Sequence, residues 1–272
     1  MSKSSWIRRM FEDGIKLKEQ YGAENVFDFS LGNPNIDPPE RFRGLLAEIV
    51  EECGRTPGAH MYMQNAGYTD TRTQIADYLS RTHGVPLTAE HIVMTCGAGG
   101  ALNVVFKTLF DPEDEIIIPK PFFAEYTFYA DNHGGVPVFV ETNEDFSLNL
   151  DVIGKAVTGR TKAVLINSPN NPTGKVYDQA SIDGLSALLE EKGREFGTEI
   201  YLVSDEPYST IVYDGITVPS ILKACKNSLL VTSYSKSLSV PGERIGYIAV
   251  NPAAVDMEKI MGGLTLSNRI LG

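Results

Sequence analysis

Short apolar runs, separated by segments with helical periodicity, constrain the fold of this chain more than any other feature. The runs lie at residues 92–95, 115–118, 136–140, 161–166, 200–203, 229–232 and 245–250. They are continuous stretches rich in Val, Ile and Leu rather than polar–apolar alternations, which is typical of strands buried on both faces. Because helices separate the strands, the sequence predicts an α/β domain of three α/β/α layers around a mostly parallel sheet, with right-handed crossovers.

The segments between and before these runs favour helices. Apolar residues recur at spacings of three and four, and Asp178 is a candidate N-cap. We expect helices near residues 5–20, 40–53, 69–82, 101–110, 122–132, 148–156 and 178–196, and an extended run at 26–31. The runs at 229–232 and 245–250 are the last strands that the pattern predicts.

Composition excludes several classes of partner. The chain has 272 residues, of which 42% are hydrophobic and 22% charged, as is ordinary for a soluble globular protein. A net charge of −11 without a basic run argues against nucleic acid and anionic membranes as partners. Cys53, Cys96 and Cys225 have neither pairing nor metal-ligand spacing, and we expect no bound metal. With no signal peptide and no membrane-length apolar stretch, the chain is predicted to be cytoplasmic.

Polar groups follow the carboxyl ends of several predicted strands. Gly97, Asn167, Asp205 and Lys236 each come directly after such a run. In an open α/β sheet, ligands bind at the carboxyl ends of the strands. These residues are therefore candidates for one binding site.

Lys236 lies among hydroxyls in the segment 233–239, just past a buried strand. Lysine is rarely buried without a partner, and desolvation lowers its pKa and frees the amine as a nucleophile. Such an amine forms Schiff bases with carbonyls, and pyridoxal phosphate is the commonest cofactor to use one. An exposed loop lysine is the alternative, and it would be favoured if this lysine stood alone.

The segment Gly97-Ala98-Gly99-Gly100 lies between a predicted strand and a predicted helix. Glycine lets the backbone approach an anion closely, and the free N–H groups at a helix start bind phosphate. An ordinary tight turn is the alternative. A dinucleotide site would need a glycine where Leu102 stands, and no Gly-Lys-Ser/Thr of a Walker loop follows.

Other residues supply the remaining contacts that a phosphorylated pyridine ring would need. Arg244 is a bidentate cation for phosphate, and Ser233 and Ser235 could add hydroxyl donors. Asp205 could keep a pyridine nitrogen protonated, and Tyr208 could donate to the phenolate oxygen. The alternative for Arg244 is an exposed arginine at a strand start. The alternative for Asp205 is an aspartate that caps the helix or turn after the strand.

Two loops offer further ring contacts. Phe122 or Phe123 could stack on a flat heteroaromatic ring, although a core aromatic is about as good an interpretation. The loop 167–174 is dense in turn residues, and an Asn side chain there could donate to a ring oxygen. Singly these signals are weak; together they describe one pyridoxal phosphate site.

The sequence resembles the class I/II aminotransferases, which are fold-type I pyridoxal-phosphate enzymes, over nearly its whole length. The resemblance is carried by Ser-Pro-Asn-Asn-Pro-Thr-Gly at 168–174, Ser-Asp-Glu-Pro-Tyr at 204–208, and Ser-Tyr-Ser-Lys-Ser-Leu at 233–238. A fourth motif, Pro-Gly-Glu-Arg-Ile-Gly-Tyr, follows at 241–247. The resemblance implies that Lys236 carries the Schiff base and shuttles the proton, while Asp205 holds the ring nitrogen.

The resemblance also implies roles for the other motif positions. Tyr208 and Asn171 would bind the 3-oxygen, Phe123 would stack on the ring, and Gly97, Ala98, Gly99, Ser233 and Arg244 would hold the phosphate. Tyr62 would reach the phosphate of a neighbouring subunit, which implies a homodimer with shared sites. Gly32 and Asn171 would lie near the substrate carboxylate, and Pro121 and Pro172 occupy positions that are often cis.

The implied organisation is an N-terminal arm with a small-domain segment at 1–45 and a cofactor-binding large domain at 46–272. A C-terminal lobe with the substrate-binding arginine is expected to be absent. The implied function is transfer of an amino group from an L-amino acid to a 2-oxo acid. A carbon–sulfur β-lyase and a non-catalytic cofactor-binding fragment or regulator remain open, and a dinucleotide oxidoreductase is more distant.

Overall fold

The computed structural model describes residues 5–28 and 32–272 and forms two compact units, Met1–Asp37 and Pro38–Gly272. The first unit contains α1 (Ser5–Tyr21) and a 3₁₀ helix, η1 (Ala23–Asn25). Lys18 forms an ion pair with Asp28 at 2.8 Å within this unit. Of the extended run expected at 26–31, residues 29–31 lie outside the described residues, and 26–28 form no strand. The assignment of 1–45 and 46–272 to two functional domains stays a prediction.

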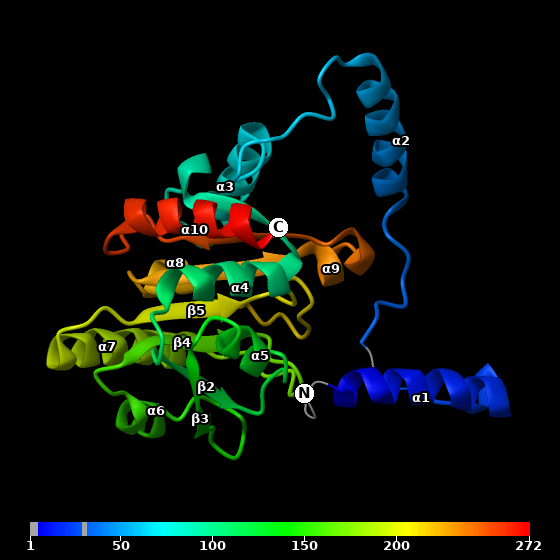
Figure 1. Ribbon diagram of the computed structural model, residues 1–272. Helices are drawn as coiled ribbons and strands as arrows, with labels where there is room; N and C mark the ends of the chain where they lie inside the picture. The colour runs from blue at the N-terminus through cyan, green and yellow to red at the C-terminus, as the bar shows by residue number, and fades with distance from the viewer. Residues whose placement is uncertain (1–4, 29–31) are drawn as a thin grey trace. The chain divides into compact units, whose positions relative to one another are not determined.

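The second unit is built on a single seven-stranded sheet (Figure 1). In spatial order the strands are β1 (Ile92–Cys96), β7 (Ile245–Val250), β6 (Ser228–Ser233), β5 (Tyr201–Asp205), β4 (Thr161–Asn167), β2 (Glu115–Lys120) and β3 (Val136–Glu141). Only β7 is antiparallel to its neighbours, so the other strands all run in one direction. The mostly parallel sheet predicted from the apolar runs is confirmed.

The register of the strands brings the candidate residues to one edge of the sheet. Asn167 is paired with Asp205 at the ends of β4 and β5. Ser233 at the end of β6 is paired with Gly246 near the start of β7. Because β7 is reversed, its amino-terminal end lies at the same edge as the carboxyl ends of the other strands, and this brings Arg244 there.

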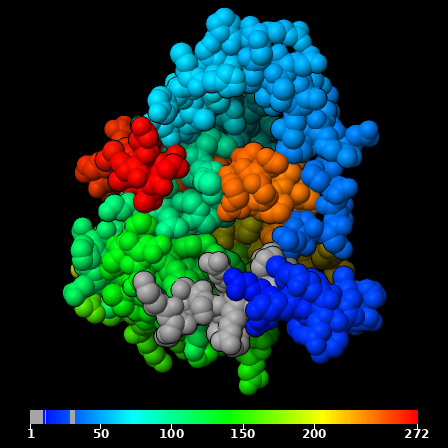
Figure 2. Space-filling model, turned by 45° about the vertical axis from the view of Figure 1, so that its right-hand side comes forward, coloured from blue at the N-terminus to red at the C-terminus, as the bar shows by residue number. Residues whose placement is uncertain are grey.

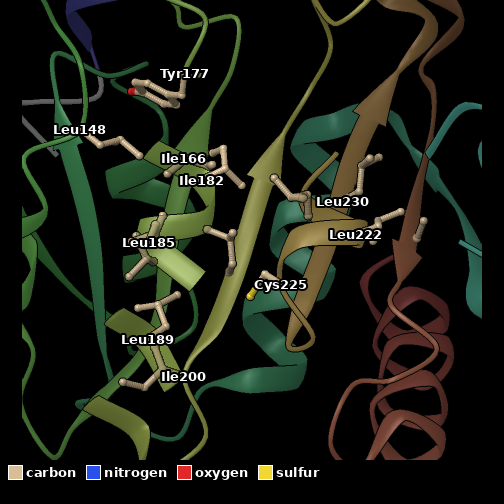
Figure 3. Packing of buried hydrophobic residues seen from close by; sticks show 14 of the residues in the cluster. Leu148, Ile166, Tyr177, Ile182, Leu185, Leu189, Ile200, Leu222, Cys225 and Leu230 are labelled. Atoms are coloured by element: carbon tan, nitrogen blue, oxygen red, sulfur yellow. The ribbon is translucent and has the colours of Figure 1, made fainter. Parts of the chain in front are cut away.

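Helices cover both faces of the sheet and complete the predicted three layers. One face packs against α4 (Gly97–Leu109), α5 (Tyr126–Asp131) and α10 (Met257–Leu271). The other packs against α3 (Thr69–His83), α6 (Leu150–Ala156), α7 (Gln179–Phe196) and α8 (Ile221–Ala224). Figure 3 shows the core on this second face of the sheet, where Leu185 and Leu189 of α7 pack with strand residues such as Ile166. Burial of these side chains supplies the main favourable term in folding.

Two helix starts differ from the sequence-based expectation. α4 begins at Gly97 rather than near residue 101, because the glycine-rich segment forms the first turn of the helix instead of a loop before it. α5 is short and begins only at Tyr126, after a turn that follows β2. α7 begins as predicted, since Oδ1 of Asp178 accepts a hydrogen bond from the Ser181 amide at 2.8 Å.

A helix that the sequence pattern does not indicate, α10, follows β7 and packs against α4. Ile260 and Leu264 are buried, but Gly262 and Gly263 interrupt the apolar pattern that would reveal the helix in the sequence. Gly263 permits close packing, since a Cβ there would lie 2.7 Å from Cγ2 of Thr108 on α4.

α2 (Glu40–Arg55) forms as expected but buries none of its residues. The apolar side chains Leu45, Leu46, Ile49 and Val50 are exposed along it. Among residues 5–28 and 32–272, no helix combines the length and apolar character needed to cross a bilayer.

Candidate active site

The carboxyl edge of the sheet collects the residues on which the sequence analysis depends. Gly97 follows β1, Asp205 ends β5, and Lys236 lies on α9 (Tyr234–Ser237), a short helix directly after β6. Orange atoms of the segment around α9 are exposed on the face that Figure 2 shows, as are green atoms of the segment that contains α5. The predicted convergence of these strand ends is therefore present.

Asp205 is the buried acid of this edge. Its Oδ2 accepts a hydrogen bond from the hydroxyl of Tyr126 at 2.7 Å. Its Oδ1 is buried and has no hydrogen-bond partner among the described residues. Burial raises the pKa of Asp205 to about 6, and the bond from Tyr126 opposes that rise only in part. A buried acceptor without a donor is costly, so this oxygen is suited to a cationic N–H group of a ligand.

Tyr126 is a site residue for which the sequence analysis assigns no role. It lies on α5, it is itself buried, and its pKa is raised well above the ordinary value by burial and by the nearby Asp205. The only sequence signal is its place in the aromatic segment 121–126.

The two phenylalanines of that segment differ in their surroundings. Phe123 contacts Tyr126 edge-on, with ring centroids 5.6 Å apart. Phe122 instead stacks on Phe139 of β3, with ring centroids 4.9 Å apart and an angle of 7° between the ring planes. Of the two candidates for ring stacking, Phe123 is thus the one beside Tyr126 and Asp205.

Asparagines connect the ends of β4 and β5. Asn167 donates from Nδ2 to the backbone oxygen of Asp205 at 2.7 Å and accepts from the Asn171 amide at 2.6 Å. Nδ2 of Asn171 reaches the Tyr208 hydroxyl at 3.5 Å. Burial and the charge of Asp205 raise the pKa of Tyr208, so its phenol keeps its proton and remains a donor.

The backbone beside these asparagines contains cis peptide bonds before Pro121, Pro169 and Pro172. The positions expected at Pro121 and Pro172 are confirmed. The cis bond before Pro169 was not anticipated.

Lys236 is half-buried, and burial lowers its pKa from the ordinary value. A lower pKa increases the fraction of neutral, nucleophilic amine near neutral pH. Ser233 and Ser235, on either side of Tyr234, are buried. The carboxyl edge of the sheet therefore carries the amine of Lys236 and the hydroxyls of Ser233 and Ser235, as expected from the sequence.

The glycines at the start of α4 allow close approach of an arginine and a tyrosine. Gly97 has a φ of +70°, and a Cβ there would lie 2.9 Å from Nη2 of Arg244. A Cβ on Gly99 would lie 2.9 Å from the hydroxyl of Tyr129. Free amides, a guanidinium and a phenol thus meet at a helix start, which is the donor set of an anion site.

Tyr129 is a second residue that the sequence analysis missed. Its hydroxyl donates to Oε2 of Glu125, and burial together with that carboxylate raises its pKa. A single tyrosine in an amphipathic helix carries no signal that distinguishes this place from a core position.

Tyr62 and Gly32 are the two remaining predicted residues. The side chain of Tyr62 is 96% exposed, and the guanidinium of Arg269 lies 5.7 Å from its ring centroid. Tyr62 lines a cavity of about 500 Å³ together with Cys96 and Asn268. Gly32 belongs to the first unit, so its role rests on the resemblance alone. The described residues contain no cluster of three or more potential metal ligands.

The fold and this site define a three-layer α/β protein with a desolvated lysine and a buried aspartate at one edge of the sheet. The family model for aminotransferase class I and II matches residues 24–271. The chain belongs to that family, which confirms the resemblance found in the sequence.

Individual proteins of known sequence or structure agree with this assignment. An amino transferase structure from Eubacterium rectale is 40% identical with a TM-score of 0.91, covering 98% of this chain and 68% of that one. The aspartate aminotransferase of Thermus thermophilus with maleate is 30% identical with a TM-score of 0.83, covering 97% and 65%. A probable aspartate aminotransferase of Methanocaldococcus jannaschii is 30% identical over 92% of this chain. The chain spans 61% of the length of that relative.

Proposed function

We propose that this chain acts in pyridoxal-phosphate-dependent transfer of an amino group from an L-amino acid to a 2-oxo acid. The observation that carries the proposal is the buried Oδ1 of Asp205, which has no partner among the described residues. It lies at the sheet edge that also presents Lys236. A pyridinium nitrogen is the kind of donor that this oxygen requires.

The residues present fit pyridoxal phosphate. Asp205 would bind the ring nitrogen, Phe123 would stack on the ring, and Tyr208 with Asn171 would bind the 3-oxygen. The phosphate would be held by a larger set, namely the amides of Gly97, Ala98 and Gly99, the hydroxyls of Ser233 and Ser235, and Arg244. When bound, the cofactor supplies an electron sink for the electrons of the bond that breaks at the substrate Cα.

The chain's own groups would then do the acid–base work. Lys236, whose pKa is lowered by burial, would take the Cα proton and later return it. Asp205 would keep the ring nitrogen protonated, since an ionised carboxylate beside it stabilises the cation. Phe123 and the adjacent Tyr126 would exclude water from the Asp205 side of the ring.

Substrates and assembly belong to the same proposal. Relatives named aspartate aminotransferase and aspartate/prephenate aminotransferase make L-aspartate the first donor to test. Gly32 and Asn171 would lie near the substrate carboxylate.

The exposed Tyr62, flanked by the exposed Met61 and Met63, supports a homodimer in which Tyr62 reaches the neighbouring phosphate. We place the protein in the cytoplasm, because its three cysteines are unpaired.

The test is a single-turnover assay on protein loaded with pyridoxal phosphate. L-aspartate, L-alanine and L-asparagine are each added without an acceptor, and 2-oxo acid is quantified against protein. We expect one equivalent from a preferred donor and continued turnover only after 2-oxoglutarate is added. Lys236→Ala is the control. Release of more than one equivalent of ammonia without an acceptor, or no oxo acid from any donor, would contradict transamination.

A further inference from the structure

A second cavity lies on the other side of the sheet from Asp205. Its volume is about 610 Å³, within the range of pockets that bind small organic ligands. Its wall comes from α3, from the loop after β5 and from α9, together with the strand residues Leu230 and Tyr247. Leu230 and Tyr247 belong to the core packed on α3 and α7, whereas Tyr126 beside Asp205 belongs to the core of the opposite face.

Glu206 is the one acidic side chain in the wall of this cavity. It directly follows Asp205 in the chain, but its Oε1 accepts a hydrogen bond from the Ser204 hydroxyl at 2.8 Å. Its residue surface is only 3% exposed, yet it contributes to the cavity lining. Its second carboxyl oxygen, Oε2, has no hydrogen-bond partner among the described residues and is not one of their fully buried atoms, so it is open to the cavity. A buried carboxyl with a free oxygen in a cavity is a ready partner for a ligand.

The rest of the wall determines which ligand that is. Three tyrosines line it, Tyr78 of α3, Tyr234 of α9 and Tyr247 of β7, and the rings of Tyr234 and Tyr247 lie 6.0 Å apart. The lining contains no lysine and no arginine. Its histidine, His83, hydrogen-bonds Ser220 through Nδ1, and burial lowers its pKa, so it stays neutral near pH 7.

This combination favours a cation over an anion. An anionic ligand would find no positive charge in the wall and would face Glu206. A cation would find a carboxyl group and three tyrosine rings, and aromatic rings of this kind bind quaternary ammonium groups in other proteins. We propose that this cavity is a binding site for a small organic ammonium ion, with Glu206 as its counter-ion and Tyr78, Tyr234 and Tyr247 as its aromatic wall.

The cavity borders the site proposed for pyridoxal phosphate, since Ser233, a candidate phosphate ligand, also lines the cavity and both sites include residues of α9. Tyr234 and Ser237 of α9 line the cavity, and Lys236 lies between them. A quaternary ammonium has no N–H bond and forms no Schiff base, so it distinguishes the two sites. Its binding tests the cavity even if the proposed transamination fails.

Calorimetric titration of the purified full chain with three probes of similar size tests the charge preference. We expect benzyltrimethylammonium to bind at least about tenfold more tightly than benzyl alcohol, and benzoate not to bind. Glu206→Gln, which keeps the shape and removes the charge, should weaken the cation about tenfold or more. Glu258→Gln, the same change on the exposed surface of α10, should leave its binding unchanged.

Tyr78→Leu provides a second variant should Glu206→Gln fail to fold, because Tyr78 is 48% exposed and its loss is tolerable. We expect it to weaken benzyltrimethylammonium about threefold to tenfold through loss of one aromatic face. Equal affinities for the cation and benzoate would overturn the proposal. So would unchanged binding in both cavity variants, or no binding of the cation up to about 10 mM.

Proton release gives an independent readout. Burial raises the pKa of Glu206 to about 8, so a bound cation should ionise it and release a proton below that pH. The other titratable groups facing it are Tyr78 and His83 of α3, Tyr234, Tyr247 and the adjacent Asp205. Titrations at pH 7 in two buffers of different ionisation enthalpy should show proton release that Glu206→Gln abolishes; release unchanged in that variant would contradict the assignment.

Discussion

The hydroxyl of Tyr126 donates to Oδ2 of Asp205 at 2.7 Å, although the two residues are 79 positions apart in the chain. This bond fixes one carboxylate oxygen and leaves Oδ1 for a ligand. It also favours the ionised form of Asp205 against the effect of burial. We regard Tyr126 as the residue that positions the candidate pyridine-binding carboxylate.

Tyr126→Phe should therefore weaken cofactor binding while preserving the aromatic packing against Phe123. Loss of a hydrogen bond to a charged group costs about 1.5 kcal/mol, which corresponds to roughly tenfold in the dissociation constant of pyridoxal phosphate. The pKa of Asp205 should rise further. Equilibrium dialysis measures the affinity, with the exposed Tyr213→Phe as the control. Equal affinities in the two variants would show that Tyr126 does not position Asp205.

Gly97→Ala should disrupt the proposed phosphate site. The backbone there has a φ of +70°, which disfavours alanine, and the new methyl group would lie 2.9 Å from Nη2 of Arg244. We expect a loss of about 1–2 kcal/mol in the free energy of unfolding and at least tenfold weaker binding of pyridoxal phosphate.

The matched control for this change is Gly262→Ala on α10, where a Cβ meets no atom within 4 Å. Urea unfolding should show no loss of stability for that variant, because alanine favours a helix. The proposal that Arg244 and the backbone at Gly97 hold the phosphate would be wrong if the Gly97→Ala protein bound pyridoxal phosphate as tightly as the Gly262→Ala protein.

Glu206 should make the cofactor-free protein less stable as pH rises. Burial raises its folded-state pKa from 4.5 to about 8, so its contribution is fully present below pH 4.5 and is lost as pH rises towards 8. The free energy of unfolding should fall by about 2 kcal/mol more in the unmodified protein than in Glu206→Gln between pH 6 and pH 8. Asp205 titrates mainly below this window. Identical pH slopes would mean that Glu206 is ionised in the folded state.

The sheet could be predicted because each strand carries its signal locally. Continuous apolar runs such as 161–166 and 200–203 need no knowledge of their neighbours to be recognised as buried strands. Their polar ends, Asn167 and Asp205, then converge because parallel strands end at the same edge. The candidate site followed from the same rule, and the family motifs added the individual roles.

Other features depend on contacts that no local pattern reveals. Gly262 and Gly263 interrupt the apolar pattern of α10, and only the close packing of Thr108 explains the glycine at 263. Tyr126 can be recognised as a site residue only from its hydrogen bond to Asp205, which is 79 positions away in the chain. Glu206 follows Asp205 directly, yet it is Glu206 that lines the cavity of about 610 Å³, because successive side chains of an extended chain alternate between the two faces of a sheet.

The central claim is that Lys236 forms the covalent bond to pyridoxal phosphate, and borohydride reduction followed by peptide mapping tests it most directly. The chain is loaded with the cofactor, reduced, digested and analysed by mass spectrometry, in parallel with Lys236→Ala. We predict one pyridoxyl group on the peptide that contains Lys236 and none in the variant. A label on another lysine, or equal labelling of the variant, would contradict the account.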